Sequence, residues 1–337
     1  MDWSLIMENA FVEAFGPNAI IFALAGMGLN LHFGYTGLPN FGQVAFVAAG
    51  AYSVAVGVAT FGLSLWLAVF IGMMMALLLA LILGVPTLRL RADYLAIVTI
   101  AAGEIIRLLL RGAAFRETTG GAAGIQNFAG DFFTVWLNPY SGDGVKISIP
   151  GTDVGVSYSA NQLWVLTVGW STVALACIFV YLLIRSPWGR VLKAIREDEN
   201  AVRSLGKNVY VYKLQSLTIG GVIGAIGGVI FAISRQSVVP DSLATSFTFL
   251  AYVALVLGGA ARVLGPVVGA IVFQFVSQFI DVTLRQAIGA DHITFLVANE
   301  VGIVRQILVG VGLMLLMIFR PQGIIGDKRE VAVSVRR

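Results

Sequence analysis

The chain has 337 residues, of which 58% are hydrophobic and only 12% are charged. Soluble domains usually carry about 25% charged residues, so this composition excludes an ordinary soluble protein. The formal net charge is +4. The single cysteine, Cys177, lies in an apolar run and excludes both an internal disulfide and a cysteine-based metal site.

The charged residues are clustered along the chain. No Asp, Glu, Lys or Arg occurs from Ala14 to Leu88, and this stretch is long enough for roughly three bilayer crossings at about 20 residues each. The sequence therefore predicts an all-α, polytopic transmembrane bundle that lies in the cell (inner or plasma) membrane and contacts lipid.

Apolar runs bounded by turn signals predict about nine transmembrane helices. Residues 1–326 are expected to form one transmembrane domain, followed by a tail at 327–337. We expect Pro86 to end the third helix. In chain order the predicted helices cover 10–33, 43–61, 63–85, 94–110, 162–184, 214–233, 243–257, 267–280 and 301–319.

The positions of Lys and Arg predict the orientation, because these residues concentrate on the cytoplasmic side. With the N-terminus outside, the segments 86–93, 185–213, 258–266 and 320–337 lie inside. They hold 15 of the 22 Lys and Arg residues. The sequence therefore predicts an external N-terminus, a cytoplasmic C-terminus and an external loop at 112–161.

Two Gly-rich breaks, 34–42 and 258–266, interrupt the apolar runs, and the helices beside the second break are too short for certain full spans. Non-helical backbone at membrane depth is tolerated where it is buried or lines a watery cavity. Both breaks are therefore candidates for a translocation path. The candidate residues are Asn30, Tyr35, Thr36, Gly37, Gln43, Glu104, Gly258 and Gly259.

Glu104 and Arg107 lie three residues apart on one predicted helix. Charges inside a membrane mark function by default, but such a pair can also neutralise itself. Pairing and a pathway role both stay open. His32 is predicted to be a satisfied helix-end residue. The repeat Gly220, Gly224 and Gly228 predicts close helix packing, with a sliding surface as the alternative.

The segment 185–213 is the main charged island. It predicts a short amphipathic helix whose apolar residues need a surface to cover them. Three consecutive acidic residues, 197–199, would be repelled by anionic lipid, which favours docking on a protein over an ordinary lipid-facing loop. The residues predicted to carry docking are Val191, Ile195, Arg196, Glu197, Asp198, Ala201 and Gly206.

Nine short phrases, in this order, resemble the branched-chain amino acid ABC transporter permeases of the LivM type. They begin at Gly28, Gly34, Leu88, Gly103, Thr119, Ala194, Val256, Gly265 and Phe319 and read GLNL, GYTG, LRLRADYLAIVT, GEIIR, TGGAAGI, AIREDENA, VLGG, GPVVGA and FRPQG. The urea permeases share most of them. Here Asn40-Phe-Gly-Gln43 replaces the family's usual Gly-His after GYTG, which leaves the substrate open.

The resemblance implies a permease subunit of an ABC importer that moves branched-chain amino acids, or a related small polar solute, by alternating access. It implies a second homologous permease, two ATP-hydrolysing subunits docked on the 185–213 loop, and an external binding protein. Gly120, Gly121 and Gly124 are candidates to face that binding protein. ATP would be bound by the partner subunits, and no nucleic acid is involved.

The rival classes are an ion-coupled secondary transporter and a membrane enzyme. A secondary transporter predicts ionisable residues at mid-membrane, where only Glu104 qualifies. No phosphate-binding Gly-x-x-x-x-Gly-Lys-Ser/Thr motif occurs, because Gly206-Lys207 is followed by Asn208. The sequence predicts no catalytic residues, no metal site and no cofactor.

Overall fold

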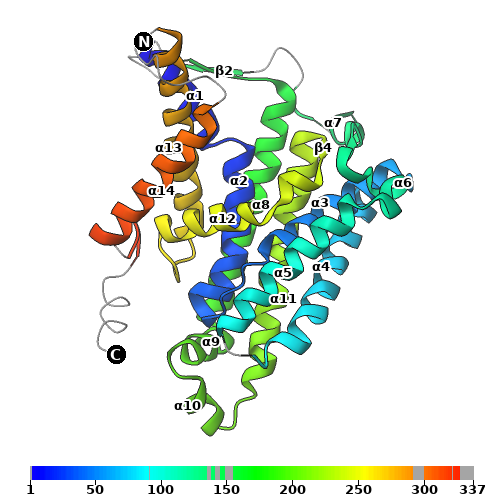
Figure 1. The fold of residues 1–337 in the computed structure, drawn as a ribbon, viewed down its shortest axis with the longest axis vertical. Coiled ribbons are helices and arrows are strands. Elements are labelled where there is room, and N and C mark those ends of the chain that lie inside the picture. The colour runs from blue at the N-terminus through cyan, green and yellow to red at the C-terminus, as the bar shows by residue number, and fades with distance from the viewer. Residues whose placement is uncertain are drawn as a thin grey trace.

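The computed structural model describes residues 2–90, 92–134, 138–140, 145–148, 155–290, 300–320 and 322–326. The predicted tail at 327–337 lies outside this part of the chain. The described residues form a helical bundle with very little sheet (Figure 1), which confirms the predicted all-α membrane class.

The longer helices are α1 (Trp3–Ala14), α2 (Pro17–Leu29), α3 (Gln43–Ala59), α4 (Leu65–Thr87), α5 (Ala92–Arg111), α8 (Ala160–Arg185), α9 (Pro187–Glu197), α11 (Val209–Arg235), α12 (Thr245–Gly258), α13 (Gly265–Gly289) and α14 (Val301–Phe319). The shorter ones are α6 (Arg116–Thr119), α7 (Gly130–Thr134), α10 (Glu199–Ser204), a π-helical turn η1 (Asn30–Tyr35) and the 3₁₀ turns Ala113–Phe115, Gly121–Ala123 and η4 (Pro240–Leu243). Two antiparallel pairs complete the structure, β1 (Ile125–Gln126) with β4 (Ser237–Val238) and β2 (Val145–Ser148) with β3 (Gly155–Tyr158).

The core is built around α11, which packs on α2, α3 and α4. Its glycines allow this. A Cβ on Gly220 would lie 2.3 Å from His32 Nε2, and one on Gly228 would lie 1.9 Å from the Val47 carbonyl oxygen. Gly224 is equally close to Gln43. The repeat is therefore a packing ridge, as predicted, because no larger residue fits between these backbones.

Helix α4 shows how the bundle meets lipid. Its buried residues are small and recur every four positions, at Ala68, Gly72, Ala76, Ala80 and Gly84. Its large apolar residues, such as Phe70 and Ile82, are exposed. Small residues let the helix approach its neighbours, while the outer face suits an apolar solvent. The helix also continues one residue past Pro86, which was expected to end it.

Among the described residues, four helices are long and apolar enough to cross a membrane, namely α4, α8, α11 and α13. A fifth span forms if α1, α2 and η1 count as one element with a 41° bend. This count is lower than the nine predicted, partly because α3 has 17 residues and α12 has 14. A 14-residue helix is only about 21 Å long, shorter than the hydrocarbon core.

Two predicted helices differ from the structure. The first, 10–33, is divided after Ala14, because Gly16 precedes Pro17 at the start of α2. The eighth, 267–280, extends to Gly289 and is a full-length helix of 25 residues. It includes Asp281, which pairs with Arg285 at 2.7 Å and Arg305 at 3.4 Å, so the charged residue does not end the helix.

The described parts of the four segments predicted to be cytoplasmic lie toward one end of the molecule. Arg89 lies over the Tyr210 ring, Asn30 Nδ2 donates to the Arg262 carbonyl, and Ile324 N donates to the Leu257 carbonyl. The N-terminus and the β2 strand lie at the opposite end (Figure 1). This grouping agrees with the predicted topology, while the membrane orientation itself stays a prediction.

Candidate translocation and coupling sites

The break between η1 and α3 is filled with buried polar side chains. His32 Nε2 donates to the Leu217 carbonyl at 3.1 Å, and Asn40 Nδ2 donates to His32 Nδ1 at 3.1 Å. Both ring nitrogens are satisfied, as predicted. The imidazole ties η1 to α11 and to the loop before α3, so its contacts match a structural role.

Asn30 connects η1 to the second Gly-rich break. Its Nδ2 donates to the Arg262 carbonyl at 2.7 Å, and its Oδ1 accepts from the Ala261 N–H at 2.8 Å. Ala261 has a positive φ of 59°, an uncommon backbone conformation that these bonds hold in place. The two breaks predicted separately therefore form one joined structure.

Gln43 and Thr36 are also buried and bonded to backbone. Gln43 Nε2 donates to the carbonyls of Gly220 and Ala25, at 3.2 and 3.4 Å. Thr36 Oγ1 donates to the Leu31 carbonyl at 2.8 Å and lies 2.7 Å from Ser216 Oγ. These side chains satisfy carbonyls that the π-helical turn and the close helix packing leave inside the core.

The predicted docking loop forms two helices, α9 and α10, rather than one. Leu192 and Ile195 of α9 pack on Val202 of α10 and Val209 of α11. These apolar residues therefore bury one another. The expectation that they need an outside surface to cover them is wrong for this cluster, because the loop folds back and supplies its own small core.

Acidic residues of the loop also have partners within the chain. Asp198 caps α10 by accepting from the N–H groups of Asn200 and Ala201, at 2.9 and 3.0 Å. Glu199 forms ion pairs with Arg203 and Lys213. The exposed part is the tip that contains Ala201, Leu205 and Gly206, and Leu205 is 79% exposed.

Arg196 links this loop to the membrane core. Its Nη1 donates to the Gly34 carbonyl in η1. Gly37 has a φ of +73°, and a Cβ built on it would lie 3.3 Å from Arg196 Cγ. Lys193 Nζ lies 5.8 Å from the centre of the Tyr35 ring. Helix α9 therefore packs against the end of the π-helical turn and the residues just after it.

A cavity of about 380 Å³ lies beside this contact. Thr36 and Gly37 line it together with Arg196, Glu199 and Lys213 of the loop and its flank. Thr36 and Gly37, predicted for the translocation path, therefore share a cavity with Ile195 and Arg196, predicted for docking. The contact between the two segments was not predicted from the sequence, because they are about 160 residues apart in the chain.

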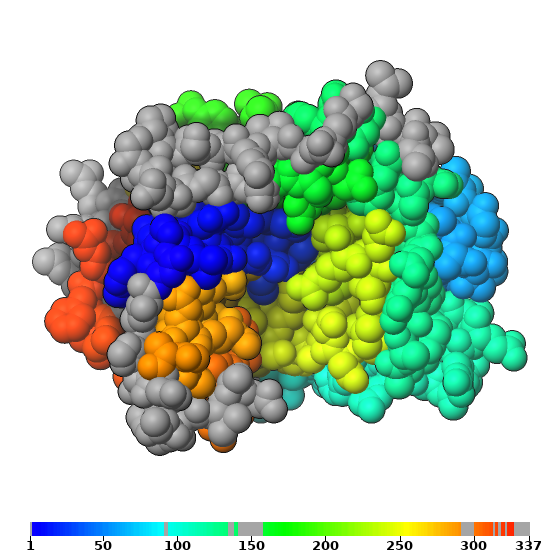
Figure 2. Space-filling model, turned by 90° about the horizontal axis from the view of Figure 1, so that it is seen from above, coloured from blue at the N-terminus to red at the C-terminus, as the bar shows by residue number. Residues whose placement is uncertain are grey.

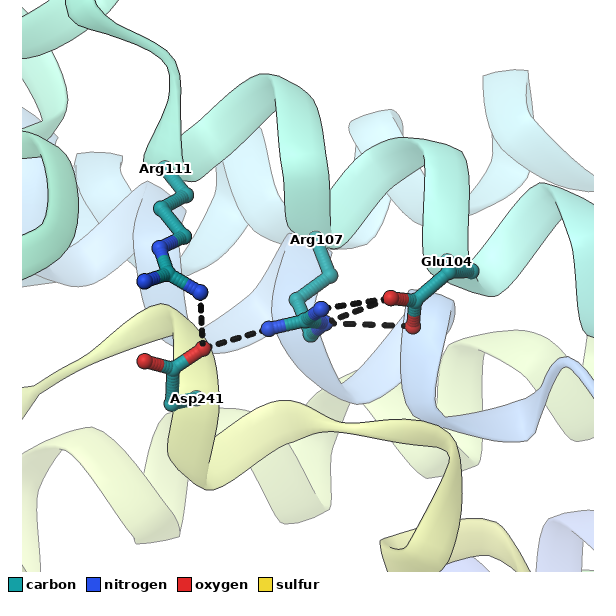
Figure 3. A network of polar contacts seen from close by, with 4 residues as sticks. All are labelled: Glu104, Arg107, Arg111 and Asp241. Carbon is teal, nitrogen blue, oxygen red and sulfur yellow. Dashed lines mark hydrogen bonds and ion pairs between the residues drawn. The ribbon is translucent and has the colours of Figure 1, made fainter.

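Glu104 and Arg107 form the ion pair that their spacing predicts, with Arg107 Nε 3.0 Å from Glu104 Oε1. Figure 3 shows that Arg107 and Arg111 both point to Asp241 of η4. Arg111 Nη1 lies 3.4 Å from Asp241 Oδ1. Two acidic and two basic residues therefore neutralise one another across α5 and η4. This geometry favours pairing, and a pathway role stays a prediction.

The other candidate glycines occupy tight backbone positions. A Cβ on Gly258 would lie 1.7 Å from the Gly265 carbonyl oxygen, and Gly259 has a φ of 115°. In the loop after α5, a Cβ on Gly124 would lie 2.1 Å from the Val238 carbonyl oxygen, where β1 meets β4. Gly120 and Gly121 have positive φ and form the same compact turn. Their geometry explains the glycines, and contact with a binding protein stays a prediction.

A second cavity, of about 570 Å³, was not predicted from the sequence. It lies among α2, α11, α12, α13 and α14, with Glu13, Asn18 and Arg235 at one side. Arg235 lies 217 residues from Asn18 in the chain, so the sequence spacing did not indicate that these helix ends meet. Within the described residues, no group of three or more His, Cys, Asp or Glu side chains could hold a metal ion.

Comparison with known proteins shows the family to which the chain is similar. Residues 16–318 match the family described as "Branched-chain amino acid transport system / permease component". The chain is 31% identical over 331 residues to the high-affinity branched-chain amino acid transport system permease protein LivM of Escherichia coli, covering 96% of this chain and 72% of that protein. It is 26% identical to a probable LivM of Methanocaldococcus jannaschii, covering 94% of both chains.

A shorter similarity reaches another transport system. Over 124 residues, or 36% of this chain, it is 29% identical to the autoinducer 2 import system permease protein LsrC of Salmonella typhimurium. The family match, in contrast, covers nearly all of the described helices. With its apolar helices, the chain is a multi-pass protein of the cell membrane. It belongs to the permease component family of the branched-chain amino acid transport systems.

Proposed function

We propose that this chain is the permease subunit of an ABC importer that moves leucine, isoleucine and valine by alternating access, with ATP hydrolysed on separate subunits. The observation that carries this proposal is the family match over residues 16–318. The permease is not itself an enzyme, and ATP binds to the partners.

The docking loop supports the coupling step. We propose that an ATPase subunit contacts the exposed tip of α10, at Ala201, Leu205 and Gly206. Because α9 and α10 share a small core and Arg196 donates to the Gly34 carbonyl, a push on the tip would move the loop as a unit against η1. In this proposal, such a movement transmits the effect of ATP hydrolysis to the membrane helices.

The remaining partners follow from the same proposal. A second homologous permease would complete the membrane domain, two ATPase subunits would bind the two coupling loops, and a binding protein would deliver the solute from outside. Exposed apolar residues on α14, such as Ile303, Ile307 and Val311, offer a surface for lipid or for the second permease.

Reconstitution tests the proposal. The chain, its partner permease, the ATPase subunits and the binding protein are placed in liposomes, and uptake of labelled leucine is measured with urea as a competitor. We expect uptake that requires ATP and both permeases and that urea does not inhibit. Leucine uptake by this chain alone, driven by an ion gradient, would contradict the proposal, and ATP-driven uptake of urea in place of leucine would overturn the substrate.

A further inference from the structure

The N-terminus lies at one end of the bundle, and the lining of the cavity of about 570 Å³ includes Glu13 and Asn18, where α1 is followed by α2. Figure 2 looks down on this end, where the N-terminal helices (blue), α13 (orange) and the α11–α12 region (yellow) meet. Cavities of about 300–1,000 Å³ are typical of small-molecule sites. The volume therefore suits a small solute with some water.

Two opposite charges line this cavity and are linked by one amide side chain. Asn18 Nδ2 donates to Glu13 Oε1, and Arg235 Nη2 donates to Asn18 Oδ1 at 3.0 Å. The Asn18 amide therefore stands between the carboxylate and the guanidinium. The Arg235 guanidinium lies 4.5 Å from the centre of the Phe231 ring, which fixes its plane. An arginine has five N–H donors, so further donors remain for a ligand carboxylate.

Polar groups also lie deeper in the cavity wall. Gln274 and Ser277 are 7% and 9% exposed and line the cavity from α13. Among the described residues, neither side chain has a hydrogen-bond partner. Their polar atoms are not among the fully enclosed polar atoms that lack a partner, so they reach the cavity and can hydrogen-bond to water or to a polar solute there. Both side chains indicate a site that receives a polar solute.

Part of the cavity lining is aromatic. The rings of Phe22 and Phe247 are stacked with centres 4.9 Å apart, and Phe273 meets Phe22 edge-on at 5.7 Å. All three line the cavity, with Leu250 and Val253 nearby. Apolar walls of this kind bind an aliphatic group and provide no hydrogen bonds, so they select against a purely polar solute such as urea.

We propose that this cavity binds an α-amino acid with an aliphatic side chain, with its ammonium at Glu13, its carboxylate at Arg235 and its side chain against Phe22, Phe247 and Phe273. A zwitterion needs both charges met, and the cavity offers Glu13 and Arg235 beside an apolar wall. A second guanidinium in the lining, Arg305, lies 3.4 Å from Asp281 and is paired within the protein. This inference rests on the proposed function, because the bound molecule is the transported one.

Binding to the purified complex of both permeases and the ATPase subunits, without the binding protein, tests the inference. The probes are leucine, leucinamide, which lacks the carboxylate, and 4-methylpentanoate, which lacks the ammonium. The wild-type complex should prefer leucine to both. Arg235→Gln should weaken leucine binding about tenfold to a hundredfold, as loss of a hydrogen bond to a charged group predicts, and should abolish the preference over leucinamide.

Glu13→Gln should instead abolish the preference over 4-methylpentanoate while keeping that over leucinamide. A matched control is Glu8→Gln, which removes a carboxylate from the same helix but away from the cavity lining. General unfolding would remove both preferences in both variants. It cannot explain why Arg235→Gln loses only the preference over leucinamide and Glu13→Gln only the preference over 4-methylpentanoate. Phe273→Trp places a larger ring in the cavity beside the apolar wall. It should weaken leucine binding more than alanine binding, because the leucine side chain needs more of that space.

Uptake measured in the same preparations separates the two proposals. If the wild-type complex imports leucine while Glu13→Gln and Arg235→Gln keep wild-type affinity and preferences, the cavity assignment is wrong and the proposed function stands. If the wild-type complex neither binds nor imports leucine, the proposed function fails and the cavity assignment with it.

Discussion

Two regions of this bundle gather polar side chains in apolar surroundings, and they differ in what those side chains contact. At the break between η1 and α3, Asn30, His32 and Gln43 bond to protein groups that the irregular backbone leaves inside. In the cavity of about 570 Å³, Gln274 and Ser277 are also buried, at 7% and 9% exposed, but they line open space. A polar residue at a helix break is therefore no sign of a solute path until its partners are known.

The largest expected effect is on the packed region. Gly220→Leu should prevent accumulation of folded protein, because its Cβ alone would lie 2.3 Å from His32 Nε2 and 2.6 Å from the Gly28 carbonyl oxygen. Overpacking of a tight core costs about 1–3 kcal/mol or more. Gly302→Ala on α14, where a Cβ meets nothing within 4 Å, is the control. The measurement is the yield of monodisperse protein in detergent, and normal yield of Gly220→Leu would contradict the packing.

A second variant tests the contact between the packed region and the docking loop, 185–213. Arg196→Gln removes the charged donor to the Gly34 carbonyl, so ATP-driven uptake should fall about tenfold or more while the assembled complex still hydrolyses ATP. Arg203→Gln is the matched control, because Arg203 is exposed and pairs only locally with Glu199 among the described contacts. Equal uptake in both variants would show that the Arg196 contact does not couple the docking loop to η1.

The smallest effect is expected for the charge network on α5. Glu104→Gln with Arg107→Gln should leave uptake near normal and lower the free energy of unfolding by about 1 kcal/mol or less, because Glu104 is 39% exposed and exposed pairs contribute little. Uptake and thermal unfolding are compared with those of Arg107→Gln alone, which leaves Glu104 without its ion-pair partner while Asp241 keeps Arg111. Complete loss of uptake in the double variant would establish a pathway role.

Apolar length predicted α4 and α8 well, because their large side chains face outward and dominate the sequence pattern. It predicted the end of α13 poorly, because Asp281 resembles a helix-ending residue until its partner Arg305 on α14 is known. The division after Ala14 had a local signal in Gly16-Pro17, which the surrounding apolar run obscured.

The candidate sites were predictable to different extents. The position of the docking loop follows from its charge, but the mutual burial of Ile195 and Val202 depends on a fold-back that helical periodicity does not encode. The cavity of about 570 Å³ could not be predicted from the sequence. Glu13, Asn18 and Arg235 lie at the ends of three different helices, and Asn18 links the other two side chains only in the folded structure. Single charged residues at span ends are expected for topology alone, so neither one stands out in the sequence.

The difference between the helix break and the cavity is tested most directly by two variants. For each, the KM for leucine uptake and the unfolding temperature are measured. Asn30→Ala leaves the Ala261 N–H and the Arg262 carbonyl without their partner, whereas Gln274→Ala removes an amide that faces the cavity. We expect Asn30→Ala to lower the unfolding temperature with an unchanged KM, and Gln274→Ala to raise the KM with an unchanged unfolding temperature. The opposite pattern would contradict the account, because it would place the solute at the break and the structural role at the cavity.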